Sequence, residues 1–262
     1  MIIDFHVHFF KDDLAPKAMQ KLSTAAGIPH FTDGTQCGLT ESMKKSGVDI
    51  SVCQHIATRP EQTQIVNRWG IKVQTGQIYS FGSIHPDFEE WENEIDYIYS
   101  AGIKGVKFHP DYQNFRVDER RLYPIYEYIF SKGLTVLFHA GVDLAYKPPY
   151  ACTPHHLSKV VADFPNGRIV AAHMGGYRFW DEVETCLVGK NLFLDTSFSF
   201  TELGKERFEN MISLHGDERV LFASDSPWTS QSAEVENIQS LNLPSKTIDK
   251  ILGENARLLL NI

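Results

Sequence analysis

Short apolar runs separated by longer amphipathic segments repeat along the whole chain of 262 residues. Runs rich in Val, Ile and Phe are typical of buried strands, and the segments between them have the hydrophobic spacing of helices. We expect strands over residues 2–10, 49–58, 78–86, 103–110, 134–141, 168–176, 191–199 and 219–228. Strands that alternate with helices form a parallel sheet, and eight such units predict an α/β fold, a (β/α)8 TIM barrel.

Helix-start signals lie between several of the predicted strands. Thr40 precedes ESMKKSG, Asp87 precedes FEEWENEIDYIYSAG, and Thr153 precedes Pro154, a residue common in the first turn of a helix. We expect each of the three to cap a helix. The length suits one domain, and no linker or low-complexity tract interrupts the chain, so we expect a single domain over residues 1–262.

The first predicted strand, IIDFHVHFF, has an ionisable residue at every second position. Because side chains alternate across a strand, Asp4, His6 and His8 should share one face, with Phe5 and its apolar neighbours on the other. We expect the apolar set to pack on helices and both imidazoles to face the barrel interior. Asp4 would then orient a metal-binding histidine from behind.

Histidine or aspartate also ends three later runs: His139 in VLFHAG, His173 in VAAHMGG and Asp225 in LFASDSPW. Functional groups of a TIM barrel lie at the C-terminal ends of its strands, so these three should converge with His6 and His8 on one rim. A catalytic metal takes three or four His and carboxylate ligands and leaves one position open. Each histidine alone fits a hydrogen-bonded core residue equally well, but the set predicts a metal site.

The segments DFHVH, FHAG, AHMGG and ASDSPW resemble motifs of the amidohydrolase superfamily, most closely its amidohydrolase-2, or ACMSD-like, branch. The likeness spans nearly the whole chain. It implies that His6, His8, His139 and Asp225 hold a divalent metal, with zinc as the first expectation and manganese or iron as alternatives. It also implies that His173 polarises a metal-bound water and that Asp225 is the catalytic base.

Lys107 and His109 in GVKFHP share strand parity, so both can face the cavity. In some branches of the superfamily a lysine on the fourth strand is carbamylated and bridges two metals. Lys107 resembles that lysine, although one metal is favoured. It could instead bind a substrate carboxylate, which we prefer, or be neutralised by barrel carboxylates. His109 and Arg178 are further candidates for substrate binding, and His109 before Pro110 also fits a histidine that only caps its strand.

The resemblance implies a metal-dependent hydrolase that cleaves an amide, lactone or ester bond of a small metabolite. The alternative is a metal-dependent decarboxylase of a small unsaturated or aromatic carboxylic acid, because the ACMSD-like branch includes such enzymes. A barrel that binds metal without turnover fits less well, since Asp225 and His173 are both intact. A phosphoesterase also fits less well, because few basic residues lie near the proposed rim.

The composition of the chain limits the classes of binding partner that we expect. A formal net charge of −8 argues against nucleic acid, whose recognition needs clustered Lys and Arg. The four cysteines form no paired motif, which suits the cytoplasm. No signal peptide and no run of about 18 apolar residues is recognisable. We therefore expect a cytoplasmic protein that acts on a small molecule, without nucleic acid or membrane as a partner; a homo-oligomer is compatible with this fold.

Overall fold

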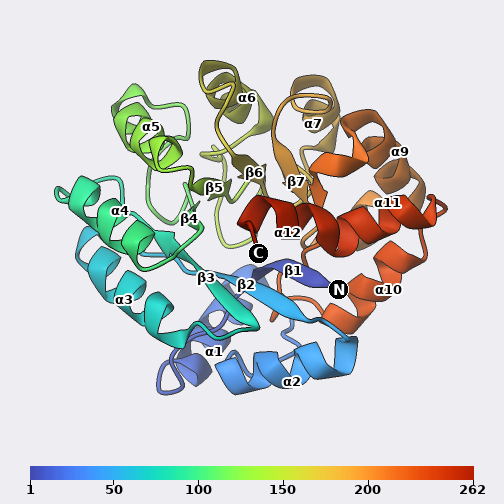
Figure 1. Cartoon of the computed structure of the whole chain (residues 1–262), viewed down its shortest axis with the longest axis horizontal. Coiled ribbons are helices and arrows are strands. Elements are labelled where there is room, and N and C mark those ends of the chain that lie inside the picture. The colour runs from blue at the N-terminus through green and yellow to red at the C-terminus, as the bar shows by residue number, and fades with distance from the viewer.

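A computed structural model describes all 262 residues. Its strands form one parallel sheet in the order β1 to β8. Hydrogen bonds from Phe5 N to Phe222 O (2.9 Å) and from Asp225 N to His6 O (2.8 Å) join the two ends of the sheet into a barrel. Helices surround the barrel (Figure 1), so the predicted TIM-barrel fold is confirmed.

The strands are short and lie within the predicted runs. They are β1 (Ile3–Val7), β2 (Ile50–Gln54), β3 (Ile78–Ser83), β4 (Gly105–Phe108), β5 (Thr135–Phe138), β6 (Ile169–Ala171), β7 (Phe193–Asp195) and β8 (Val220–Leu221). Each predicted run extends past the end of its strand, because its last residues leave the ladder and enter the following loop. His8, His139, His173 and Asp225 therefore lie just beyond their strands.

Helices follow the strands around the barrel. They are α1 (Ala15–Ala26), α2 (Gln36–Ser46), α3 (Thr63–Val73), α4 (Trp91–Ser100), α5 (Tyr123–Ser131), α6 (Pro154–Asp163), α7 (Trp180–Cys186), α8 (Phe200–Leu203), α9 (Lys205–His215), α10 (Gln231–Gln239), α11 (Ser245–Asp249) and α12 (Asn255–Leu260). None of them has both the length and the apolarity that a membrane span requires.

The helix-start signals predict one cap correctly and two incorrectly. Thr153 caps α6, because its hydroxyl accepts a backbone N–H of the first turn. In α2 this role belongs to Thr35, so Thr40 lies inside the helix. Asp87 lies in a turn before α4, where its N–H donates to His85 Nδ1 at 3.2 Å. A local motif identifies a capping residue, but the path of the loop decides which candidate is used.

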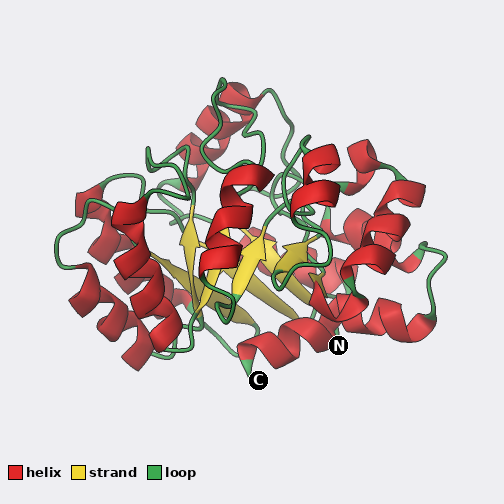
Figure 2. Ribbon diagram, turned by 90° about the horizontal axis from the view of Figure 1, so that it is seen from above, coloured by secondary structure: helices red, strands yellow, loops and turns green.

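Separate apolar cores fill the inside of the barrel and pack its outside against the helices. Phe5 and Phe81 belong to the inner core, with ring centroids 5.5 Å apart in an edge-to-face arrangement. Ala256, Leu259 and Leu260 of α12 belong to it as well, and α12 lies across this end of the barrel in Figure 1. The strands run away from both termini in Figure 2, so their C-terminal ends meet at the opposite, loop-covered end.

The first strand departs from the predicted alternation. Phe5 lies in the inner core and Val7 in the outer one, although strict alternation places them on one face. The register between β1 and β2 shifts between Asp4 and Val7, so His6 points inward directly after Phe5. Such irregularities often re-aim a side chain beside an active site. The prediction that Phe5 packs on helices is therefore wrong, whereas His6 and His8 reach the interior cavity.

A close backbone approach holds the end of β5 against the loop after β6. Tyr177 N donates to Ala140 O at 3.0 Å, and Val142 N donates to Tyr177 O at 3.0 Å. Gly141, between them, has a φ of +88°, and a Cβ there would lie 2.2 Å from Tyr177 N. Glycine is required here both for its backbone conformation and for the space.

We predict that Gly141→Ala lowers the free energy of unfolding by roughly 3 kcal/mol or more, because the clash adds to the cost of a positive φ. Gly102→Ala is the matched control, since Gly102 has a φ of +82° but open space around it. That variant should lose only about 1 kcal/mol. Urea denaturation measures both values, and equal losses would contradict the close approach at Gly141.

Candidate metal centre

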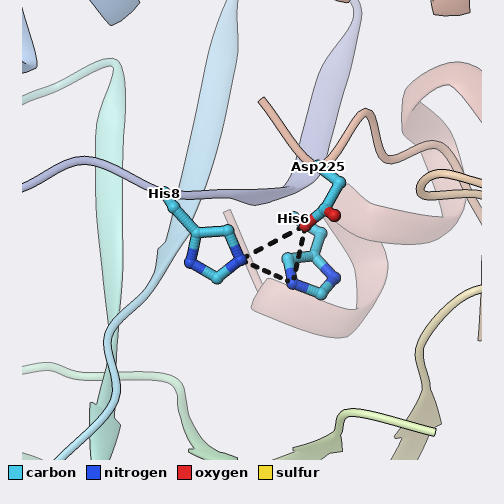
Figure 3. Close-up of side chains that lie close together, drawn as sticks. All are labelled: His6, His8 and Asp225. Atoms are coloured by element: carbon cyan, nitrogen blue, oxygen red, sulfur yellow. Dashed lines mark hydrogen bonds and ion pairs between the residues drawn. The ribbon is translucent and has the colours of Figure 1, made fainter. Parts of the chain in front are cut away.

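His6, His8 and Asp225 bring three possible ligand atoms together where β1 and β8 end (Figure 3). His6 Nε2 lies 3.2 Å from His8 Nε2 and 3.5 Å from Asp225 Oδ1. His8 Nε2 lies 3.2 Å from the same oxygen. Burial alone would raise the pKa of Asp225, but the surrounding histidines, His8 first among them, hold it below its usual value. Asp225 therefore presents a carboxylate to the two imidazoles.

Hydrogen bonds behind the rings decide which nitrogen of each histidine is free. His6 Nδ1 donates to Asp195 Oδ2 at 2.9 Å, and His8 Nδ1 donates to the Gln54 carbonyl at 2.9 Å. A neutral imidazole has one N–H, so both Nε2 atoms carry lone pairs. Burial, and next the charge of Lys107, hold the pKa of His6 well below its usual value, which keeps that ring neutral. Lone pairs that face a carboxylate oxygen with no proton between them fit a divalent metal.

His139 and His173 form a hydrogen-bonded pair. His173 Nδ1 donates to the Ser197 carbonyl at 3.1 Å, so its Nε2 accepts from His139 Nδ1 at 3.0 Å. His139 Nε2 is therefore unprotonated, and it is buried without a hydrogen-bond partner. A buried polar atom of this kind is costly unless a ligand meets it. His139 Nε2 is thus suited to be a further metal ligand, although His139 is not part of the cluster of His6, His8 and Asp225.

A second group of potential ligands, His109, His139 and Asp143, lines the same cavity. The His109 and His139 rings are stacked, with centroids 4.1 Å apart and planes 11° apart. Ring lone pairs lie in the ring planes, so those of stacked rings do not converge on one ion. His109 Nε2 lies 3.3 Å from Asp143 Oδ2, while the Tyr112 N–H approaches its Nδ1 at 3.5 Å. This geometry makes His109 a hydrogen-bond donor to Asp143. The sequence pattern had singled out His109 but not Asp143.

Lys107 lies on the cavity floor with 1% of its surface exposed. Its Nζ lies 3.3 Å from His6 Nε2 and forms no ion pair. Burial lowers the pKa of Lys107 to about 8, although the charges of Asp195 and Asp225 oppose this change. A buried cation whose hydrogen-bond partner is a neutral imidazole, with no anion beside it, is costly. An anionic group of a ligand would supply the missing opposite charge.

One cavity of about 550 Å³ connects these groups. The predicted site residues that line it are His6, His8, Lys107, His109, His139, His173 and Asp225. Arg178 does not line it, because its guanidinium pairs with Glu202 through hydrogen bonds of 2.8 and 2.6 Å. Its position gives no support to the predicted role in substrate binding.

Asp195, and not Asp4, holds the His6 ring from behind. Asp4 is buried but accepts hydrogen bonds from the Ser224 hydroxyl and from Gln231 Nε2, and burial raises its pKa to about 6. It ties β1 to the segment after β8 and does not contact an imidazole. The sequence does carry a signal for Asp195, because this residue ends the apolar run of β7, just as the predicted ligands follow theirs.

The chain matches the Amidohydro_2 family model, described as amidohydrolase, over residues 3–262. The chain belongs to this amidohydrolase family. The resemblance seen in the sequence motifs is therefore confirmed, and so is the expectation of an enzyme of this superfamily. The candidate ligand groups suit a divalent metal, as expected. No curated protein sequence matches the chain.

Three solved structures illustrate the likeness. An uncharacterised TIM-barrel protein from Bordetella bronchiseptica has a TM-score of 0.78 at 21% identity, covering 99% of this chain and 98% of its own. The 5-carboxyvanillate decarboxylase from Novosphingobium aromaticivorans, with bound manganese, has a TM-score of 0.75 at 12% identity, covering 100% of this chain and 97% of its own. The 2,6-dihydroxybenzoate decarboxylase from Rhizobium has a TM-score of 0.74 at 14% identity, covering 99% of this chain and 98% of its own. At these identities the likeness establishes the fold alone.

We predict about one divalent metal per chain after loading with Mn²⁺ or Zn²⁺ and gel filtration. His6→Ala combined with His8→Ala should reduce the content to near zero, because both Nε2 ligands are lost. His173→Asn should keep most of the metal, since its ring nitrogens bind Ser197 and His139. Elemental analysis measures the content, with circular dichroism to verify folding. Two metals per chain, together with the added mass of a carbamate on Lys107, would contradict the one-metal arrangement.

Proposed function

We propose that this protein is a metal-dependent decarboxylase of a small aromatic or unsaturated carboxylic acid. The observation that carries the proposal is the Lys107 ammonium, which is buried on the cavity floor beside His6 and has no carboxylate partner. A substrate carboxylate would give it a charge-assisted hydrogen bond in a site with little water. Two proteins of similar structure are decarboxylases of aromatic acids.

Hydrolysis, the first expectation from the sequence, stays a prediction. The bond that such a hydrolase cleaves is a neutral amide, lactone or ester, so Lys107 would have no opposite charge at the reacting group itself. It would keep its desolvation cost unless the substrate carried a carboxylate elsewhere. Decarboxylation places the opposite charge on the group that reacts.

His6, His8 and Asp225 would hold the metal, with His139 Nε2 as a further ligand. Imidazole ligands suit zinc, while the manganese in a decarboxylase of similar structure supports manganese as the alternative. When bound, the metal supplies a Lewis acid that orients a substrate oxygen and withdraws electron density from the reacting carbon.

The reaction breaks the C–C bond to the carboxylate, releases CO2 and leaves an electron pair on carbon that a proton must capture. Lys107 would hold the carboxylate before this bond breaks. Asp225 is the group we assign to proton delivery, because its Oδ1 faces His6 and His8 while its Oδ2 has no hydrogen-bond partner. Since this carboxylate starts ionised, it must first take the proton from an acidic group of the substrate or from solvent.

Lys107→Met keeps the length of the side chain and removes the charge. We predict that kcat/KM falls about 1000-fold, in line with the roughly 4 kcal/mol that a buried charge pair can contribute. Lys104→Met, a half-buried lysine just before β4, is the matched control and should leave kcat/KM unchanged. The assay follows CO2 release from a panel of hydroxybenzoic acids and unsaturated dicarboxylic acids, with NMR in D2O to detect deuterium on the carbon that lost the carboxylate.

Decarboxylation by Lys107→Met at the wild-type rate would reject the role of Lys107. Cleavage of esters or lactones, with no CO2 released from any acid in the panel, would reject the decarboxylase and establish the hydrolase.

A further inference from the structure

The cavity extends beyond its ionisable floor into an apolar compartment, which we call the apolar arm. It is bounded by Leu14, Leu22 and Ile28 of the β1–α2 connection and by Ile65, Val66 and Trp69 of α3. None of the candidate metal or catalytic residues lies in this arm. The arm therefore has no role in holding the metal.

Helix α1 carries an apolar stripe that the protein covers only in part. Ala15 and Met19 are buried, whereas Leu22 and Ala26, next along the same face, are half-buried and line the cavity. The spacing of these four residues is that of one helical face. The stripe thus continues from the core into the cavity, where a ligand is the group that can cover it.

Two large apolar side chains at the mouth of the arm are strongly exposed. Leu14 is 52% exposed and Ile65 is 58% exposed, and both line the cavity. Of the charged side chains nearby, Arg59 and Glu61 pair with each other at 3.0 Å, whereas Lys11, which also lines the cavity, forms no ion pair. Removal of this apolar surface from water favours an apolar occupant.

We propose that the apolar arm binds an alkyl or aryl tail on the end of the substrate that points away from Lys107. This inference rests on the proposed function for the position of the carboxylate, and it adds that the substrate is amphipathic. A cavity of about 550 Å³ lies in the range that encloses drug-sized molecules, so it has room for head and tail together. A hydroxylated tail would find no hydrogen-bond partner on Leu22, Ile65 or Val66.

The test is a binding series on the metal-loaded full chain: benzoate and its 4-methyl, 4-ethyl, 4-propyl and 4-butyl derivatives, measured by isothermal titration calorimetry. We expect Kd to fall about fourfold for each buried methylene. The ether 4-(2-methoxyethyl)benzoate matches the butyl compound in heavy atoms and should bind about tenfold more weakly, because its oxygen loses water without a new partner.

Leu22→Gln combined with Ile65→Gln should reduce the gain to less than twofold per methylene and leave the Kd of benzoate unchanged. Both side chains are at least partly exposed, so the double variant should fold. Leu258→Gln on α12 is the matched control, since Leu258 is 69% exposed and does not line the cavity. It should behave as the wild type does.

A Kd that stays the same along the series would overturn the proposed role of the apolar arm, and so would a failure of every member to bind. Equal binding of the ether and the butyl compound, or a full gain retained by the double variant, would overturn it as well. The same acids are assayed for CO2 release. Binding that depends on chain length without CO2 release keeps the arm and rejects the decarboxylase, whereas CO2 release without that dependence rejects the arm and keeps the decarboxylase.

Discussion

The candidate site depends on the closure of the barrel between its first and last strands. Asp225 N donates to His6 O at 2.8 Å and His8 N donates to Ser226 O at 2.6 Å, so the backbone that closes the barrel also carries three ligand groups. Residues more than 200 positions apart are thereby held within 3.5 Å of one another. These bonds hold the main chain of the three residues, and the hydrogen bonds of His6 Nδ1 to Asp195 and of His8 Nδ1 to the Gln54 carbonyl orient the two rings.

Burial of charge on the cavity floor is the second constraint. Lys107 and Asp225 line the cavity and Asp195 lies behind His6, and their opposite charges offset part of the cost of removing each from water. Asp195 uses its oxygens on His6 and on the backbone of the β6 and β7 ends, which leaves Lys107 without a direct ion pair. The floor is thus organised before a ligand arrives, and an anionic ligand meets a cation that needs no rearrangement.

The cavity combines parts of different origin. Its floor comes from strand ends, whose positions are set by the barrel, whereas its apolar arm comes from the β1–α2 connection and from α3. TIM barrels change substrates by changing loops while strand ends keep the chemistry. The half-covered stripe of α1 would thus select the substrate from a connection outside the barrel strands.

The sequence alone predicted the strands, the barrel and most residues of the candidate site, because hydrophobic period and polar strand ends are local signals. It did not determine the direction of Phe5, since the register shift in β1 arises from pairing with β2. Nor did it separate Asp195 from Asp4, because which carboxylate meets His6 depends on strands far apart in the chain. The pairing of Arg178 with Glu202 and the stacking of His109 on His139 were likewise decided only by tertiary structure, since a side chain's partner is set by packing and not by its neighbours in sequence.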